Sequence, residues 1–157
     1  MIELGDEKVL YAFDKELEPA LVVPSGTTVR VRTKDCFGNQ VQRPEDELDE
    51  IDWDHINPAT GPIFVEGAVP GGALKVTIEA IEFDGQTASC TGEGEGVCGD
   101  RFDAWSTHLC KIDGDELVWD EELRIPLRPM IGVIGVAPAG EPVNCGTPGS
   151  HGGNMDN

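Results

Sequence analysis

Hydrophobic and polar residues alternate along several short segments of the chain. Residues 27–34, TTVRVRTK, place Val29 and Val31 on one side and two arginines on the other, and residues 73–83 alternate in the same way. A period of two residues is typical of a half-buried β-strand. The pattern therefore favours strands over helices.

Further short strands are expected between turn sequences. They cover residues 9–13, 20–23, 63–66, 105–112 and 116–120, and the 20 glycines and 11 prolines of the 157-residue chain supply many turns. Short strands separated in this way are typical of a β-meander, and Asp-Gly-Asp at 113–115 predicts a hairpin. The length is close to that of one average domain, so we expect a single β domain over residues 1–157.

The last third of the chain joins a hydrophobic run to a long polar loop. Residues 125–136 are rich in isoleucine and valine and are interrupted by Gly132 and Gly135, which is typical of a buried strand that another backbone or a ligand approaches closely. From residue 138 onward the chain is rich in glycine, proline and asparagine and cannot build a core. Loops of this length held by a strand are either functional or disordered.

The chain is strongly acidic, and this narrows the class of partner. It has 11 Lys and Arg against 30 Asp and Glu, a formal net charge of -19, which repels a polyphosphate backbone and argues against nucleic acid as a partner. Solubility explains this acidity more simply than a cationic partner does. Residues 41–54 hold most of one charge run, and we expect an exposed loop or a short irregular helix there.

Neither a membrane nor a disulfide framework is indicated. The first twenty residues lack a basic segment followed by an apolar one, and no apolar window approaches the roughly 18 residues needed to span a bilayer, so a cytoplasmic protein without a membrane partner is expected. The five cysteines are odd in number and irregularly spaced, so reduced thiols are expected. Cys145, in the polar loop, could be reactive.

Four segments together resemble the acetamidase/formamidase family of amide hydrolases. They are TKDCFGNQ at 33–40, NPATGPIFVEGAVPGG at 57–72, IPLRPMIGVIGVAPAGEP at 125–142 and SHGGNMDN at 150–157. The resemblance implies hydrolysis of a small aliphatic amide to a carboxylate and ammonia, on a mostly β scaffold with a jelly-roll-like sandwich. It also implies a divalent metal such as zinc.

Two departures from the family pattern bear on this resemblance. Family chains are roughly twice as long, so we expect this chain to correspond to the N-terminal half, either as a split subunit or as a fragment of a longer chain. The expected partner is a second copy in a homo-oligomer or a second chain that supplies the C-terminal half. The turn after the VEGA sequence reads PGG, with Gly72 where the family has an acid, while Glu66 is retained. The alternative is a non-catalytic β-sandwich module for binding or assembly.

Amide hydrolysis needs an activated water or nucleophile, a stabilised oxyanion and an acid for the departing nitrogen, and a bound metal can supply the first two. His151 and Asp156 are the best local pair of metal ligands. Backbone N–H groups of Gly152 and Gly153 could approach a substrate oxygen, and Asn154 could hydrogen-bond an amide. The simpler alternative is a turn with solvated polar side chains.

Two carboxylates outside this loop are the catalytic candidates. Glu66 follows a short predicted strand and could project into a cleft as a general base, although a surface acid at a strand end is an equal alternative. Asp35 could contact substrate or a neighbouring catalytic group, although an Asx-turn explains it more simply. His55 and His108 are not candidates.

Overall fold

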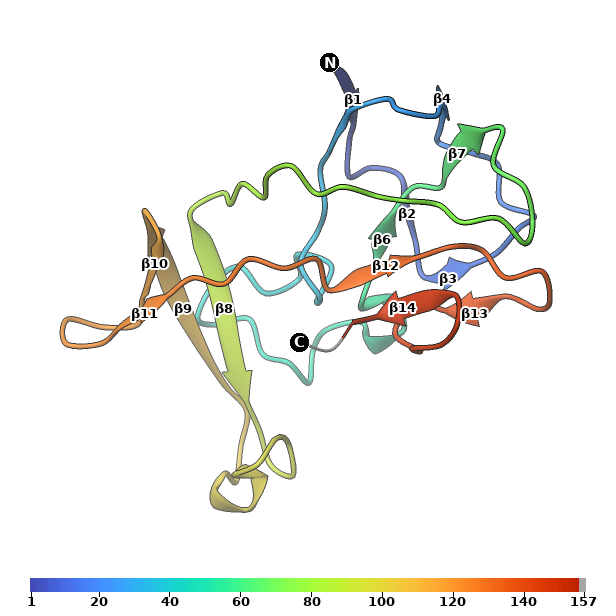
Figure 1. Cartoon of the computed structure of the whole chain (residues 1–157). Helices are drawn as coiled ribbons and strands as arrows, with labels where there is room; N and C mark the ends of the chain where they lie inside the picture. The colour runs from blue at the N-terminus through green and yellow to red at the C-terminus, as the bar shows by residue number, and fades with distance from the viewer. Residues whose placement is uncertain (156–157) are drawn as a thin grey trace. The chain divides into compact units, whose positions relative to one another are not determined.

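The computed structural model describes residues 1–155, and in that part of the chain regular structure consists of short strands and two 3-10 turns (Figure 1). The prediction of a mostly β fold is confirmed, and the open sheets are consistent with a β-sandwich-like protein. The elements are β1 (Ile2–Leu4), β2 (Val9–Leu10), β3 (Ala12–Phe13), β4 (Leu21–Pro24), β5 (Val29–Val31), η1 (Trp53–His55), β6 (Ala59–Thr60), β7 (Ile63–Glu66), β8 (Gln86–Thr91), η2 (Gly99–Arg101), β9 (Ser106–Asp113), β10 (Glu116–Val118), β11 (Arg124–Pro126), β12 (Val133–Gly135), β13 (Val143–Asn144) and β14 (Gly152–Asn154).

The chain forms two compact units, each assembled from separated segments. Unit 1 comprises Met1–Gly38, Trp53–Ile78 and Ile131–Asn157, and unit 2 comprises Asn39–Asp52 and Glu79–Met130. Unit 1 is built from paired strands: β1 with β5 and β4 with β7 run parallel, whereas β2–β6, β3–β13 and β12–β14 are antiparallel. Unit 2 contains a four-stranded antiparallel sheet in the order β11-β10-β9-β8.

Unit 1 buries few of its large apolar side chains. In the parallel β4–β7 pair Val23 is buried, but the neighbouring cross-strand pair of Val22 and Phe64 is 53% and 52% exposed. Its other buried hydrophobic residues are Leu4, Phe13 and Cys145. One face of this strand pair is therefore uncovered.

Unit 2 contains the hairpin predicted from Asp-Gly-Asp, with β9 and β10 joined through Gly114 in the left-handed conformation (φ 60°). Its core includes Cys110 together with Val41 and Leu48, which come from the acidic segment 41–54. The expectation of an exposed loop there is wrong for these two side chains. Charge content alone does not reveal that two apolar residues anchor the segment.

Asp46 fixes the conformation of this acidic segment. Its carboxylate accepts the backbone N–H groups of Gln42 and Arg43, at 2.8 and 2.9 Å, and the Arg43 guanidinium at 2.8 Å. These interactions, first the hydrogen bond from Gln42 and then those of Arg43, hold the pKa of Asp46 below its usual value. The loop is therefore ordered by a half-buried acid and by two buried side chains.

The buried strand expected over residues 125–136 is not present. The segment splits into β11 in unit 2 and β12 in unit 1, and Ile125, Ile134 and Val136 are exposed. Pro126 and Pro129 have no backbone N–H, so a continuous ladder cannot run through them. Residues 73–83, expected as a strand, likewise contain no paired strand.

The described residues contain no helix with the length and apolar character needed to cross a bilayer.

Candidate functional site

His151 lies at a tight turn in unit 1 that leads into β14. Gly149 and Gly152 exchange backbone hydrogen bonds of 2.8 and 3.0 Å, which leaves Ser150 and His151 as a two-residue loop. The His151 carbonyl also accepts the N–H of Val136, at 2.8 Å. The backbone that carries the imidazole is therefore tied on both sides.

The imidazole of His151 is packed between an aromatic ring and a glycine. Its ring centroid lies 5.6 Å from that of Phe13, with the planes at 61°. A Cβ built on Gly149 would lie 2.8 Å from Nδ1, so any larger residue there would displace the ring. The Nε2 atom is buried and has no hydrogen-bond partner among the described residues. Leaving such an atom unsatisfied costs about 1–3 kcal/mol, so a ligand for Nε2 would be favoured.

Three glycines allow β12 and β14 to approach closely at this turn. Gly152 and Gly153 have φ of 107° and 101°, where other residues are strained, and a Cβ on either would collide with backbone atoms. A Cβ on Gly135 would lie 2.9 Å from both the His151 carbonyl oxygen and the Phe13 ring. The expectation of a close backbone approach is confirmed at Gly135.

The predicted substrate-binding residues 152–154 form β14 and pair with β12. The Gly152 N–H donates to the Gly149 carbonyl, Gly153 pairs with Ile134, and Asn154 pairs with Val133 while its side chain is exposed. The Gly152 amide is thus used within the turn. Asn154 is the member of this group whose side chain faces solvent.

Cys145 lies in the same unit but is not suited to act as a nucleophile. Its side chain is fully buried, and its thiol donates to the Leu10 carbonyl at 3.5 Å. Burial raises the pKa of the Cys145 thiol to about 11. Because the thiolate is the reactive form, the thiol is inert near neutral pH.

Two asparagines that sequence reasoning did not single out meet beside Gly146. The Asn144 side-chain oxygen accepts the Gly146 N–H at 2.7 Å, and a Cβ on Gly146 would lie 3.2 Å from the Asn57 side-chain nitrogen. Asn57 has a φ of 51°, a conformation uncommon for non-glycine residues. In the sequence, the position of Asn57 directly before Pro58 is the feature that could have indicated an unusual backbone conformation here.

Glu66 is exposed at the end of β7, where Gly67 (φ 81°) begins a turn closed by a hydrogen bond from Ala68 to Val65. Within unit 1, β7 and β14 lie apart from each other (Figure 1). Among the described residues no hydrogen bond or ion pair joins Glu66 to the His151 turn. The structure does not bring the two together, and a catalytic role for Glu66 stays a prediction.

Asp35 forms the Asx-turn that was its simpler explanation. Its carboxylate accepts the Phe37 N–H at 2.9 Å, and its carbonyl accepts the Gly38 N–H at 3.0 Å. The side chain therefore shapes the DCFG turn. A role in catalysis stays a prediction.

The described residues fit a metal site only in part. Asp156 lies outside them, and within residues 1–155 no group of three or more His, Cys, Asp and Glu side chains could hold a metal ion. His151 offers one buried nitrogen that has no partner within residues 1–155. A complete ligand set would need Asp156 and further donors from outside the described residues.

The other two histidines pack against aromatic rings. His108 stacks on Trp119 with centroids 4.3 Å apart, and its Nε2 donates to the Trp119 carbonyl at 2.7 Å. His55 contacts the edge of Tyr11 with centroids 4.6 Å apart. Neither arrangement suggests a role in hydrolysis.

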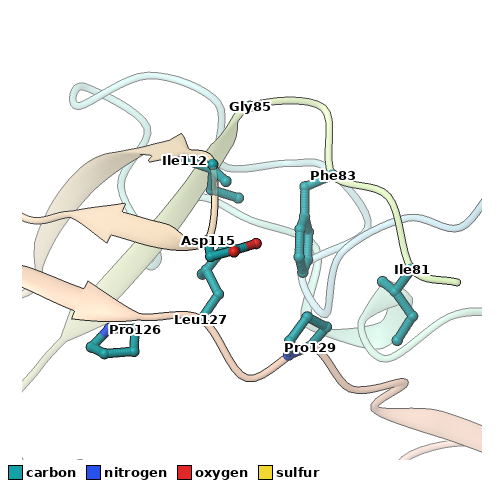
Figure 2. A pocket seen from close by; sticks show the side chains of 9 residues that line it. Ile81, Phe83, Gly85, Ile112, Asp115, Pro126, Leu127 and Pro129 are labelled. Carbon is teal, nitrogen blue, oxygen red and sulfur yellow. The ribbon is translucent and has the colours of Figure 1, made fainter.

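Unit 2 has a separate groove of about 650 Å³. Figure 2 shows Phe83, Leu127 and Pro129 around it, with the Asp115 carboxylate pointing toward Phe83. Its lining contains one carboxylate and no histidine or cysteine. The groove therefore lacks the groups that amide hydrolysis requires.

Solved structures place the chain among acetamidase-like β proteins. A recombinant predicted acetamidase/formamidase from Thermoanaerobacter tengcongensis is 49% identical, with a TM-score of 0.93, and an acetamidase from Bacillus halodurans is 43% identical, with a TM-score of 0.87. An acetamidase from Yersinia enterocolitica, at 22% identity and a TM-score of 0.75, shares the fold. Comparison with curated proteins finds no match.

The chain belongs to the Acetamidase/Formamidase family, whose model matches residues 4–144. The resemblance inferred from the four sequence segments is thus confirmed. The matches cover 98% and 99% of this chain but only 51% and 52% of the Thermoanaerobacter and Bacillus chains. The chain therefore spans about half the length of these relatives.

Proposed function

We propose that the chain is one half, the N-terminal one, of an amide hydrolase that converts a small aliphatic amide such as acetamide or formamide to a carboxylate and ammonia. Family membership and the names of the solved relatives support this reaction class. The observation that carries the proposal is the buried Nε2 of His151 in the SHGGNMDN segment, which has no partner in the part of the chain that the structure describes. An imidazole fixed in this way is prepared to bind a ligand.

His151 and Asp156 would hold a divalent metal, zinc being the best fit to an imidazole and carboxylate pair. When bound, such a metal lowers the pKa of a coordinated water and polarises a carbonyl. The chain's own contribution is positional. Three backbone hydrogen bonds and the Phe13 ring fix the His151 imidazole, so its nitrogen is presented in one orientation.

The remaining candidates take distinct roles in this proposal. The exposed amide of Asn154 would hydrogen-bond the substrate amide, beside the backbone of Gly152 and Gly153. Glu66 would act as general base, and Asp35 would contact the substrate or a neighbouring catalytic group. Since β7 lies apart from β14, Glu66 would need further parts of the enzyme to complete the site.

The proposed function is tested by measuring ammonia release from acetamide and formamide. The chain is assayed alone and after co-expression with the part of the Thermoanaerobacter protein that it does not cover, each with and without zinc. We expect release only when both polypeptides and zinc are present. His151→Asn should abolish release, whereas His55→Asn, the matched exchange at an exposed histidine, should retain it.

Complete absence of ammonia in every combination would refute the hydrolase. It would favour the alternative, a non-catalytic β-sandwich module for binding or assembly. This alternative is supported by the absence, within residues 1–155, of a group of three or more side chains that could hold a metal ion.

A further inference from the structure

Residues 73–78, ALKVTI, form an exposed stretch of unit 1 that we call the unpaired segment. Leu74, Val76 and Ile78 alternate with polar residues, and these three side chains are 49%, 57% and 47% exposed. Such alternation is the pattern of a strand with one buried face. In this structure the apolar face of the segment is exposed instead of buried.

The backbone of the unpaired segment is also unused. Among the described residues, no backbone hydrogen bond involves residues 73–78, and the chain between β7 and β8 is drawn without an arrow (Figure 1). A row of free N–H and C=O groups is a template for pairing with another strand. Side chains and backbone thus both lack the contacts that a strand makes.

The total surface shows that much more than this segment is uncovered. The accessible surface is 11351 Å² for a mass of 16.8 kDa. A folded monomer of this mass exposes about 7,700 Å², and two separate globules with the sizes of units 1 and 2 would together expose about 9,200 Å². By either comparison the excess exceeds the area that each partner contributes to a standard protein interface, about 800 Å².

We propose that residues 73–78 become a β-strand by pairing with an edge strand of the polypeptide that corresponds to the uncovered half of the relatives. This inference rests on the proposed function in that it takes the chain to be one half of the enzyme. Pairing would satisfy the backbone and bury Leu74, Val76 and Ile78 in one step. The segment would then serve as the docking strand between the halves.

The relatives and the charge of the chain favour this occupant over a second copy. The Thermoanaerobacter and Bacillus chains each contain about as much sequence again beyond the matched part. Two copies of this chain would each bring a formal net charge of -19, and their mutual repulsion opposes self-association. The charge of the chain therefore argues against a second copy as the occupant.

Hydrogen exchange and sedimentation velocity test the docking strand. The probe is the uncovered part of the Thermoanaerobacter protein, co-expressed with the full 157-residue chain. We expect a one-to-one complex in which the amides of residues 73–78 exchange at least tenfold more slowly than in the chain alone. Val76→Glu should weaken the complex at least tenfold.

Val97→Glu is the matched control. Val97 is fully exposed, so the same exchange there should leave the complex unchanged. Because Val76 is already 57% exposed, Val76→Glu should keep the melting temperature of the isolated chain, which separates a docking defect from unfolding.

The outcomes separate this inference from the proposed function. A complex with protected 73–78 amides and no ammonia release would uphold the docking strand and refute the hydrolase. Ammonia release from a complex in which these amides exchange as fast as before would do the opposite. Failure to form any complex, equal binding by Val76→Glu, or dimers of the chain alone that protect this segment would each overturn the inference.

Discussion

The imidazole of His151 lies against the ring of Phe13, with centroids 5.6 Å apart and planes at 61°, although the two residues stand at opposite ends of the sequence. Phe13 belongs to β3, whose partner β13 precedes the His151 turn along the chain. The pairing of β3 with β13 is therefore what brings the buried aromatic ring to the histidine. The orientation of the proposed metal ligand depends on this long-range contact.

Phe13→Leu should reduce the stability of the chain by about 1 kcal/mol, because it removes the edge-to-face ring contact while keeping most of the buried volume. Chemical denaturation measures this change. Phe64→Leu is the control, since Phe64 is 52% exposed and its replacement should cost less than about 0.5 kcal/mol. Equal effects of the two variants would contradict the proposed importance of the Phe13 contact.

Gly153→Ala should destabilise the chain by about 2 kcal/mol or more, because φ is 101° and the added Cβ would collide with the Thr147 backbone. Gly140→Ala should be nearly neutral, since nothing lies within 4 Å of the place that its added methyl group would take. Thermal denaturation of both variants makes the comparison. A Gly153→Ala protein as stable as Gly140→Ala would show that the close approach of β12 and β14 is dispensable.

Cys145 should react with a thiol reagent much more slowly than the exposed Cys36 and Cys98. Its raised pKa also makes stability depend on pH. The unfolded thiol ionises near pH 9 while the folded one keeps its proton to about pH 11, so its contribution to the free energy of unfolding is lost as the pH rises through this window. Denaturation curves at several alkaline pH values measure the loss, and Cys145→Ala should lack this part of it.

Asp46→Asn should loosen the acidic segment of unit 2, because the amide cannot pair with Arg43 as the carboxylate does. The pKa of Asp46 is lowered in the folded chain, so its stabilising contribution is present above the ordinary pKa of a carboxyl and is lost as the pH falls through the folded value. The variant should therefore lose less stability on acidification than the parent. Identical acid titrations of stability would contradict this role of Asp46.

Local signals predicted the elements that local chemistry determines. The strand predicted at 63–66 is β7, the alternation of residues 27–34 contains β5, and the hairpin at Asp113 follows from a glycine with positive φ. The glycine-rich composition around His151 is likewise visible in the sequence, and the role of this segment as the site stays a prediction. Turn residues and period-two patterns act over a few residues, so a single sequence displays them directly.

The pairing of strands that lie far apart in the sequence could not be predicted from local patterns. The alternation at 73–83 shows that a strand is favoured but not what pairs with it, and the structure leaves residues 73–78 unpaired. The burial of Val41 and Leu48 could not be predicted, because the acidic residues around them are typical of an exposed loop. The apposition of Phe13 and His151 depends on chain segments far apart in sequence, for which no local pattern exists.

The turn between Gly149 and Gly152 is closed by two reciprocal hydrogen bonds, and these restrict the backbone on both sides of His151. Inserting or deleting one residue there would rotate the imidazole away from Phe13 and out of its packed position. Natural variation in length among relatives should therefore avoid the histidine turn.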